Sequence, residues 1–180
     1  GGSARSDIWV MRDDGTAAVN LTADLPATAV RRSPAWSADG RQVAFVQVDP
    51  APSGTEVSIW IMQRDGSGKR RITVTTTGFD GAPTWSPDGG RLAFVRYFGG
   101  DADLMILTLA TGAERRIALP GQQLAPAWSP AGDLIAFVDI AAGGARSQLM
   151  TMRPNGTLLQ LRTLREEWGG GSAPTWIRRR

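Results

Sequence analysis

Cysteine and histidine are both absent from this chain of 180 residues. Without cysteine, the chain forms no disulfide, no thiolate metal site and no thiol redox motif. Without histidine, it lacks the usual general base, the serine–histidine–aspartate arrangement and most zinc ligand sets. We therefore expect no catalytic residues, no bound metal and no cofactor.

Lysine is nearly absent as well, since Lys69 is the sole example among 20 basic residues. The arginines are scattered, apart from Arg178–Arg180, and the net charge is only +3. Nucleic-acid binding usually needs a basic stripe or patch, so we expect no nucleic-acid partner.

Long apolar runs are missing too. No run approaches the roughly 20 residues of a membrane-spanning helix, so no membrane span is expected. A signal peptide is not recognisable, and the sequence begins at Gly1 without a methionine. We interpret the chain as a processed product or a fragment.

Tryptophan, by contrast, recurs in a fixed setting. The tripeptide Pro-x-Trp ends at residues 36, 85, 128 and 176, so the spacings are 49, 43 and 48 residues. A period of 40 to 50 residues indicates one repeated supersecondary unit. The first three copies continue into a turn such as Ser86-Pro87-Asp88-Gly89, in which proline presets φ and glycine accepts a positive φ.

Each repeat contains four short strand signals. The Pro-x-Trp strand and its turn lead to an apolar run such as Val43–Val46, whose continuous hydrophobicity implies burial on both faces. A third strand such as Ile59–Met62 leads to an Asp-Gly or Asn-Gly hairpin turn and a fourth strand. We expect the repeated aromatic rings to form the core in equivalent surroundings: Trp36, Phe45, Trp85, Phe94, Trp128, Phe137 and Trp176.

Four antiparallel strands per repeat, with no helical period between them, predict an all-β chain built of β-propeller blades. A β-sandwich is the rival all-β fold, but it does not need the same tryptophan, turn and phenylalanine in every quarter. The predicted single domain spans residues 1–180, about four blade equivalents. Its complete units are 34–73, 83–118 and 126–162, and its partial units are 7–22 and 174–180.

The two partial units allow two arrangements. They could meet in one composite fourth blade, which would lack its apolar second strand and leave unpaired edges. Alternatively, the chain is part of a ring with more blades, and we favour this interpretation. If the piece is stable alone, the exposed flanks of its end blades should drive self-association.

The ordered set Pro-x-Trp-Ser-Pro-Asp-Gly, apolar-Ala-Phe-Val, Asp-Ile-Trp-Val-Met, Asp-Gly and Arg-Ile-Thr resembles the WD40-like (PD40) repeat of the TolB propeller family. The resemblance covers nearly the whole chain. It implies a bacterial, periplasmic binding protein whose propeller usually has six blades. Similar repeats also accompany prolyl-oligopeptidase-type hydrolases and tricorn-like proteases, so the repeat indicates the fold more strongly than the function.

Other motifs fit ordinary turns better than chemical sites. Gly66–Arg70 lacks the spacing of a phosphate loop and lies in a hairpin turn. Asp101–Asp103 lacks the rest of a calcium loop. The pairs Asp13–Asp14 and Glu166–Glu167 are interpreted as solvated loop acids, because adjacency in sequence does not set the carboxylate spacing that glycoside cleavage needs.

Binding is expected in the loops that join the second strand to the third and the fourth strand to the next first strand. The former are expected at 47–57 and 96–103, and the latter include 25–32, 79–81, 122–123 and 166–168. Exposed aromatic and arginine side chains dominate interface energies. The candidate binding residues are therefore Arg31, Arg32, Tyr97, Phe98, Asp101, Gln122, Gln123 and Trp168, with Tyr97, Phe98 and Trp168 as the preferred anchors.

The favoured hypothesis is a non-enzymatic propeller that holds a protein or peptide partner on its loop face or in its channel. The alternative is a substrate-gating propeller of a prolyl-oligopeptidase-like or tricorn-like hydrolase, whose catalytic domain lies outside this chain. A sugar-cleaving propeller is disfavoured, because few acids occupy first-strand positions.

Overall fold

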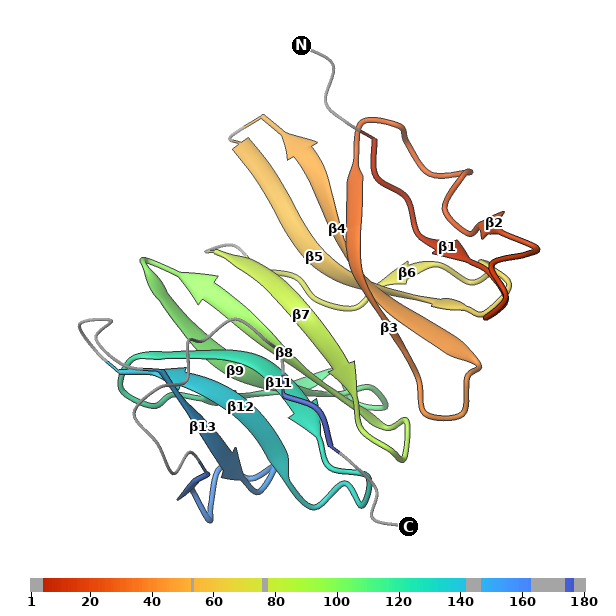
Figure 1. The fold of residues 1–180 in the computed structure, drawn as a ribbon. Helices are drawn as coiled ribbons and strands as arrows, with labels where there is room; N and C mark the ends of the chain where they lie inside the picture. The colour runs from red at the N-terminus through yellow and green to blue at the C-terminus, as the bar shows by residue number, and fades with distance from the viewer. Residues whose placement is uncertain (1–4, 53, 76–77, 142–146, 163–173, 177–180) are drawn as a thin grey trace.

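The computed structural model describes residues 5–52, 54–75, 78–141, 147–162 and 174–176 (Figure 1). Every regular element within these ranges is a β-strand, and the strands form one two-stranded and three four-stranded antiparallel sheets. The sheets stand side by side along an arc, with the β1–β2 hairpin near one end and the sheet of β11, β12 and β13 at the other (Figure 1). The predicted all-β architecture of a partial propeller is confirmed.

The three complete sheets are named blades 1, 2 and 3, and each runs in chain order from its inner to its outer strand. Blade 1 contains β3 (Val30–Trp36), β4 (Gln42–Ala51), β5 (Gly54–Gln63) and β6 (Arg70–Arg71). Blade 2 contains β7 (Phe79–Trp85), β8 (Arg91–Phe98), β9 (Asp101–Thr108) and β10 (Ala113–Ile117). Blade 3 contains β11 (Gln122–Trp128), β12 (Ile135–Ile140), β13 (Ser147–Met152) and β14 (Gln160–Leu161).

The N-terminal hairpin of β1 (Trp9–Val10) and β2 (Val19–Asn20) repeats the two outer strands of a blade. Ile8 N donates to Thr22 Oγ1 at 3.0 Å, just as Ile59 N in blade 1 donates to Thr73 Oγ1 at 2.9 Å. Ile8 also packs into the hydrophobic cluster of Phe45 on β4. The hairpin therefore occupies the place of a preceding blade beside blade 1.

The hydrophobic core lies between neighbouring blades. Phe45, Phe94 and Phe137 are fully buried, and each faces the unit that precedes its own blade. Phe94, for example, shares a cluster with Ile59 and Ile61 of blade 1. Because blades 1 and 2 bury their two faces against different neighbours, their second strands read as continuous apolar runs.

The serine of each first turn is buried and closes that turn through its side chain. Ser86 Oγ donates to Asp88 Oδ1 at 2.5 Å and accepts from Arg91 N at 2.9 Å. This hydroxyl contact is the largest cause that holds the pKa of Asp88 below its usual value. In blade 3 alanine replaces the turn aspartate, and Ser129 Oγ donates instead to Asp133 Oδ1 at 2.7 Å. The turn geometry thus survives the change of sequence.

The inner strands carry a β-bulge that the sequence did not predict. The pairing of β3, β7 and β11 with the second strand shifts register around the residue before the proline. That residue has a positive φ in all three blades, namely 53° at Ser33, 50° at Ala82 and 50° at Ala125. Such a conformation is uncommon outside glycine, and a bulge bends the strand that contains it.

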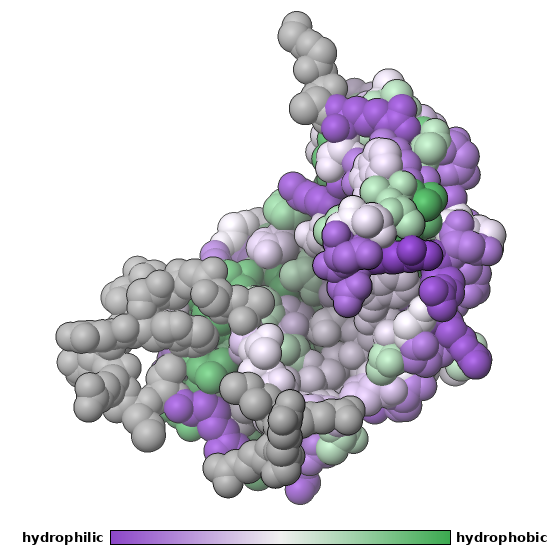
Figure 2. All heavy atoms as spheres, turned by 45° about the vertical axis from the view of Figure 1, so that its right-hand side comes forward, coloured by the Kyte–Doolittle hydropathy of each residue, from purple (hydrophilic) through white to green (hydrophobic). Residues whose placement is uncertain are grey.

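Figure 2 shows the inner side of the arc as a hollow of mostly intermediate hydropathy.

The expectation of equivalent tryptophan surroundings is wrong for Trp36. Trp85 and Trp128 are 6% and 7% exposed, but Trp36 is 48% exposed. Trp85 Nε1 donates to Ala35 O of blade 1 at 3.0 Å, so its indole lies against the preceding inner strand. No described residue forms such a strand before β3, and Trp36 is left open on that side.

The predicted loops at 47–57 and 96–103 are wrong, because strands extend through most of both segments. β4 continues to Ala51 and β5 resumes at Gly54, while β8 continues to Phe98 and β9 resumes at Asp101. Pro50 is tolerated because β3 pairs with β4 only as far as Val48. Beyond that point the missing N–H of proline faces an unpaired edge.

Candidate binding surface

The far end of the β8–β9 hairpin gathers three of the candidate residues predicted from the sequence. Tyr97 and Phe98 end β8, Asp101 begins β9, and Phe98 and Asp101 are cross-strand partners. Gly99 and Gly100 form the turn with φ values of 59° and 87°, which suit glycine. In Figure 1 this hairpin end points to the same side of the arc as the β4–β5 hairpin.

Tyr97 stacks on Phe79 at the start of β7. The two residues are cross-strand partners, with ring centroids 4.7 Å apart and an interplanar angle of 15°. Phe79 is 43% exposed, so the stack presents an aromatic face to solvent. Burial raises the pKa of Tyr97, while nearby Arg32 acts in the opposite direction. The phenol therefore stays protonated near neutral pH and can donate a hydrogen bond.

Gly78 fixes where β7 begins relative to the tyrosine. Its φ is +100°, and a Cβ built on it would lie 1.9 Å from the carbonyl oxygen of Tyr97. A larger residue would have to push the two backbones apart. The close approach that aligns Phe79 with Tyr97 thus depends on glycine at this position.

A second aromatic contact lies on the same hairpin end. The guanidinium of Arg116 is centred 4.5 Å from the ring of Phe98. Arg116 Nε also donates to Asp103 Oδ2 at 2.6 Å, and the arginine side chain is 51% exposed. The buried carboxylate holds the cation in place over the ring, where it remains accessible to a partner.

The support below these aromatics is a network of charge-assisted hydrogen bonds. Arg96 donates to both oxygens of Asp80, at 2.7 and 2.9 Å, and to Glu114 at 2.6 Å. The bonds to Asp80 are the largest cause that raises the pKa of Arg96. Asp80 is fully buried, so the network clamps β7 to β8 one residue pair from Phe79 and Tyr97, on the opposite face of the sheet.

Blade 3 joins the surface through Gln122, a further candidate from the sequence. Gln122 Nε2 donates to Gly100 O in the β8–β9 turn at 3.0 Å. Gln122 stands at the first-strand position that Phe79 holds in blade 2, as the pairing registers show. Tyr97 and Phe98 are successive residues of β8 and project from its opposite faces, so the surface wraps around the hairpin end. We define the aromatic surface as Arg32, Phe79, Tyr97, Phe98, Asp101, Arg116 and Gln122.

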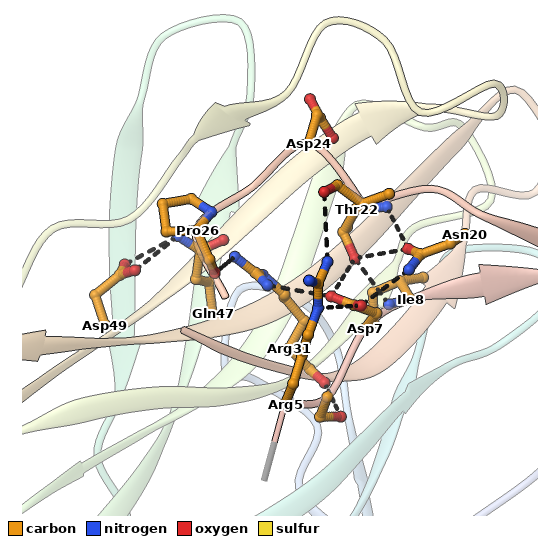
Figure 3. A network of polar contacts seen from close by, with 12 residues as sticks. Arg5, Asp7, Ile8, Asn20, Thr22, Asp24, Pro26, Arg31, Gln47 and Asp49 are labelled. Atoms are coloured by element: carbon orange, nitrogen blue, oxygen red, sulfur yellow. Dashed lines mark hydrogen bonds and ion pairs between the residues drawn. The ribbon is translucent and has the colours of Figure 1, made fainter. Parts of the chain in front are cut away.

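Two other candidates are buried on the inner strands of blades 1 and 3. Arg31 is fully buried, and it donates to Asp7 Oδ1 at 3.1 Å and to Pro26 O at 2.7 Å (Figure 3). Gln123 is also fully buried and donates to Asp139 Oδ1 at 3.3 Å. Their side chains support the inner strands and are not presented to a partner. Trp168 lies outside the described residues.

Asp7 is the centre of the network that receives Arg31 (Figure 3). Burial raises the pKa of Asp7, but hydrogen bonds from Asn20, Arg5 and Thr22 outweigh it and hold the pKa below its usual value. Asn20 Nδ2 and Arg5 Nε donate to Asp7 Oδ2 at 2.9 and 2.7 Å. The ionised carboxylate thus balances a guanidinium that has no exposure to water.

Phe79 and Arg116 were not selected from the sequence. Phe79 lies in the segment 79–81, which the sequence predicts as a loop. That prediction and the predicted loop at 122–123 are wrong, because these segments begin β7 and β11. The signal that could have found Phe79 is its cross-strand pairing with Tyr97, which depends on the register of the bulged strand. Arg116 could be predicted only from the pairing register of β9 with β10, which places Arg116 opposite Met105.

The opposite end of the strands carries a cavity of about 370 Å³ between blades 2 and 3. Its lining includes Arg91, Glu114, Arg115 and Asn155, so its charge is mixed. Among the described residues, no group of three acidic side chains could hold a metal ion. The described residues also form no helix long and apolar enough to cross a membrane.

Antiparallel four-stranded blades with bulged inner strands, packed face to face along an arc, define the chain as part of a β-propeller. The sequence matches the family described as the TolB beta propeller domain over residues 3–178. The chain therefore belongs to the TolB β-propeller family, and the sequence-based assignment is confirmed.

Solved structures agree on the fold. TolB from Acinetobacter baumannii superposes with a TM-score of 0.52 at 17% identity, covering 85% of this chain and 47% of that one. Putative TolB from Agrobacterium tumefaciens gives 0.57 at 18% identity, with 90% and 71% covered. The β-propeller domain of the Trilobed protease from Pyrococcus furiosus gives 0.60 at 16% identity, with 76% and 44% covered.

The chain thus spans about half the length of the Acinetobacter TolB. A comparison with curated proteins finds no match. At these identities, the likeness to solved structures establishes the fold alone. Any proposed function therefore has to be argued from the residues of the aromatic surface.

Proposed function

We propose that this chain is a non-enzymatic binding propeller that holds a protein or peptide segment on the aromatic surface. The observation that carries the proposal is the Phe79–Tyr97 stack, which is partly exposed at the tip of a rigidly clamped hairpin. Aromatic and arginine side chains are the commonest energetic anchors of protein interfaces. Membership of the TolB β-propeller family supports a binding role without catalysis.

The surface favours a particular chemistry in its partner. The exposed face of Phe79 accepts an apolar or aromatic side chain by stacking. Arg116 is an exposed cation over Phe98, and Arg32 is an exposed cation whose charge acts on Tyr97, so both suit a carboxylate on the same segment. The partner therefore presents an apolar side chain close to an acidic group.

The proposal is tested with peptides selected from a random displayed library on the immobilised chain, followed by calorimetric titration of the tightest synthetic peptide. Phe79→Ala should weaken binding by about 30-fold or more, the scale of a buried aromatic anchor. Arg32→Ala should weaken binding by about 3- to 10-fold.

Leu159→Ala is the matched control, because Leu159 is apolar and similarly exposed but lies beyond the opposite hairpin turn of blade 3. It should leave the affinity unchanged. If replacing the β8–β9 tip by glycine and serine leaves every selected peptide bound as before, the assignment of the surface is wrong.

A second candidate function is a substrate-gating propeller attached to a hydrolase. Its support is the likeness to the propeller domain of the Trilobed protease, which concerns the fold. The catalytic residues would then lie outside these 180 residues. A Gly-x-Ser-x-Gly segment within an α/β pattern in the same open reading frame would favour this candidate, and an open reading frame of propeller repeats alone would exclude it.

The proposed binding function includes an extracytoplasmic location, as the resemblance to TolB implies. The test is fractionation of host cells that carry the epitope-tagged, full-length gene. Recovery of the product with the periplasmic fraction is expected, and recovery only with the cytoplasm would contradict the location.

A further inference from the structure

The outer edge of blade 2 differs from the outer edges of the other units. All four outer hairpins have the same length, because their cross-strand partners stand at equivalent positions: Val10 with Val19, Ile61 with Arg70, Ile106 with Arg115 and Thr151 with Gln160. Yet β10 has 5 residues, whereas β2, β6 and β14 have 2 residues each. Among the described residues, only blade 2 therefore has a long outer strand.

The difference begins at the residue that follows each outer turn. Ala17, Gly68 and Leu158 have φ values of 52°, 63° and 56°, and strand pairing resumes only beyond the next residue. A bulge of this kind twists an edge strand and interrupts its row of outward N–H and C=O groups. The equivalent residue of blade 2, Ala113, has no positive φ and pairs directly with Thr108. The strand β10 is therefore regular from the turn onward.

The outer side of β10 is open. It ends the strand order of its sheet, and no described strand pairs with its outer side. Its first four residues, 113–116, are exposed. A regular, uncovered edge offers backbone N–H and C=O groups to a further strand. Extended peptides bind sheets in this way, with affinity from the backbone hydrogen bonds and specificity from pockets that receive alternate side chains.

A pocket of this kind lies beside β10, namely the cavity of about 370 Å³ between blades 2 and 3. Ala113 and Arg115 line it together with Thr108 and Ile106, their cross-strand partners on β9. Pro154, in the turn before β14, lines the cavity from blade 3. Alternate residues of a strand share one face, so every second side chain of an added strand would project toward this cavity.

The charge that is free in the cavity is positive. Glu114 also lines it, but this carboxylate already forms an ion pair at 2.6 Å within blade 2. Arg115 donates to Asn155 O at 3.5 Å, and no carboxylate of a described residue forms an ion pair with it. Arg91 has only a long contact of 3.4 Å with the exposed Asp88. Two guanidinium groups thus remain to bind an anionic group.

The same charge disfavours a second copy of this chain as the occupant. If β10 paired with β10 of another copy along all of its residues, the middle residue, Arg115, would stand opposite itself. Like charges directly opposite each other destabilise a strand pair. The edge is instead complementary to a segment that carries an acidic side chain.

We propose that the outer edge of β10 binds an extended peptide segment as a further strand, with an acidic side chain of that segment beside Arg115 and Arg91 in the cavity. This site is separate from the aromatic surface. Arg115 and Arg116 are successive residues that face opposite sides of the strand, and Arg116 lies over Phe98. The proposal therefore does not rest on the proposed function.

The probe is a fluorescein-labelled, amidated heptapeptide, Thr-Val-Thr-Glu-Thr-Val-Thr. It is long enough to cover β10, its residues favour strands, and its glutamate shares one face with both valines. Fluorescence polarisation with the 180-residue chain should show saturable binding with a Kd below about 500 µM, which is typical of a weak but specific contact. Absence of saturation up to that concentration would overturn the proposal.

Arg115→Glu tests the charge of the cavity. It should weaken binding of the probe by about 10-fold or more, the scale of a charge-assisted hydrogen bond. A second probe with lysine in place of glutamate should bind this variant more tightly than it binds the parent chain. Arg70→Glu is the matched control, because Arg70 is exposed at the equivalent position of blade 1. An equal loss in Arg70→Glu would overturn the proposal.

Two N-methylated probes test the backbone pairing. One carries the methyl group on the amide of its fourth residue and the other on that of its fifth residue. Successive N–H groups of a strand point to opposite edges, so only one of the two amides can donate to β10. One methylated probe should lose about 10-fold or more in affinity while the other stays within about 2-fold of the parent probe. Equal behaviour of both would contradict strand addition.

The last arm separates this site from other sites and occupants. Phe79→Ala should leave the affinity of the probe unchanged, whereas a loss would place the probe on the aromatic surface and overturn the proposal. Sedimentation of the parent chain should show that no dimer competes with the probe. A stable dimer that excludes the probe would mean that a second copy covers β10, which would also overturn it. Circular dichroism and thermal unfolding establish that each variant remains folded.

Discussion

Blades 1 and 2 use the same backbone position in opposite ways. Arg31 in blade 1 and Asp80 in blade 2 are both fully buried on the inner strand, and they pair in register with Gln47 and Arg96 on the second strand. Asp80 forms its ion pair with Arg96 of the same blade. Arg31 forms its ion pair with Asp7, which directly precedes β1 of the N-terminal hairpin.

The difference shows that the repeat fixes the backbone and the burial, while each blade satisfies its buried polar group separately. Blade 2 is electrostatically self-contained, and blade 1 depends on residues 5–26. Blade 3 gives a third solution, a neutral amide, since Gln123 faces Asp139. A buried charge costs far more when it is left alone than when it is paired, so the three blades should respond differently to loss of a partner.

Asp7→Ala should have the largest effect. It removes the carboxylate that balances Arg31, whose guanidinium has no access to water. The expected loss in free energy of unfolding is about 3–5 kcal/mol. Urea unfolding followed by tryptophan fluorescence measures it, and a loss below about 1 kcal/mol would mean that Arg31 does not depend on the N-terminal hairpin.

Asp80→Ala should be less damaging, at about 2–3 kcal/mol. Arg96 loses a bidentate partner but keeps Glu114 at 2.6 Å. Charge-assisted hydrogen bonds contribute on this scale. The same urea experiment tests the order of the two variants. If Asp80→Ala proves more harmful than Asp7→Ala, the distinction between the self-contained and the dependent blade fails.

Gln123→Leu should cost about 1–2 kcal/mol, because it removes a neutral donor of similar size from blade 3. Asp139 keeps its hydrogen bond from Gln148 at 3.0 Å. Thermal unfolding should therefore show a smaller fall in Tm than either aspartate variant. An effect as large as that of Asp7→Ala would mean that Asp139 depends on Gln123 as strongly as Arg31 depends on Asp7, which would contradict the proposed order.

Acid should weaken the N-terminal hairpin and blades 1 and 2 together, with a small contribution from each group. The pKa values of Asp7, Asp24, Asp39 and Asp88 are lowered in the folded chain from a usual value of 3.8. Stability from a lowered pKa is fully present above the unfolded value and is lost as pH falls through the folded value. Tm should be nearly constant from pH 5 to 8, where no histidine titrates, and should fall below about pH 4. A transition centred near pH 6 would contradict this assignment.

Much of the fold could be predicted from the sequence, because turns and apolar runs are local signals that recur with the repeat. The buried polar positions could not. Arg31 and Arg32 are neighbours on one strand, and period-two alternation shows only that they face opposite sides. The burial of Arg31 requires Asp7, which lies 24 residues earlier and is brought close by the hairpin.

The candidate surface was predictable in part for the same reason. Tyr97 and Phe98 stand out by residue type, and the hairpin does present them. The stack with Phe79 depends on the pairing register of β7 with β8, and that register depends on the bulge at Ala82. Ala82 has a positive φ, which an alanine in the sequence does not indicate. The exposure of Trp36 depends on what packs beside it, which the local sequence does not state.

The most direct test of the proposed binding function uses the single tyrosine of the chain, Tyr97. With ¹³C-labelled tyrosine, the ring gives one set of resonances in the centre of the aromatic surface. Titration with the tightest selected peptide should shift these resonances progressively to saturation, and Phe79→Ala should abolish the shift. Saturating binding by calorimetry with no change in the Tyr97 resonances would show that the partner binds elsewhere.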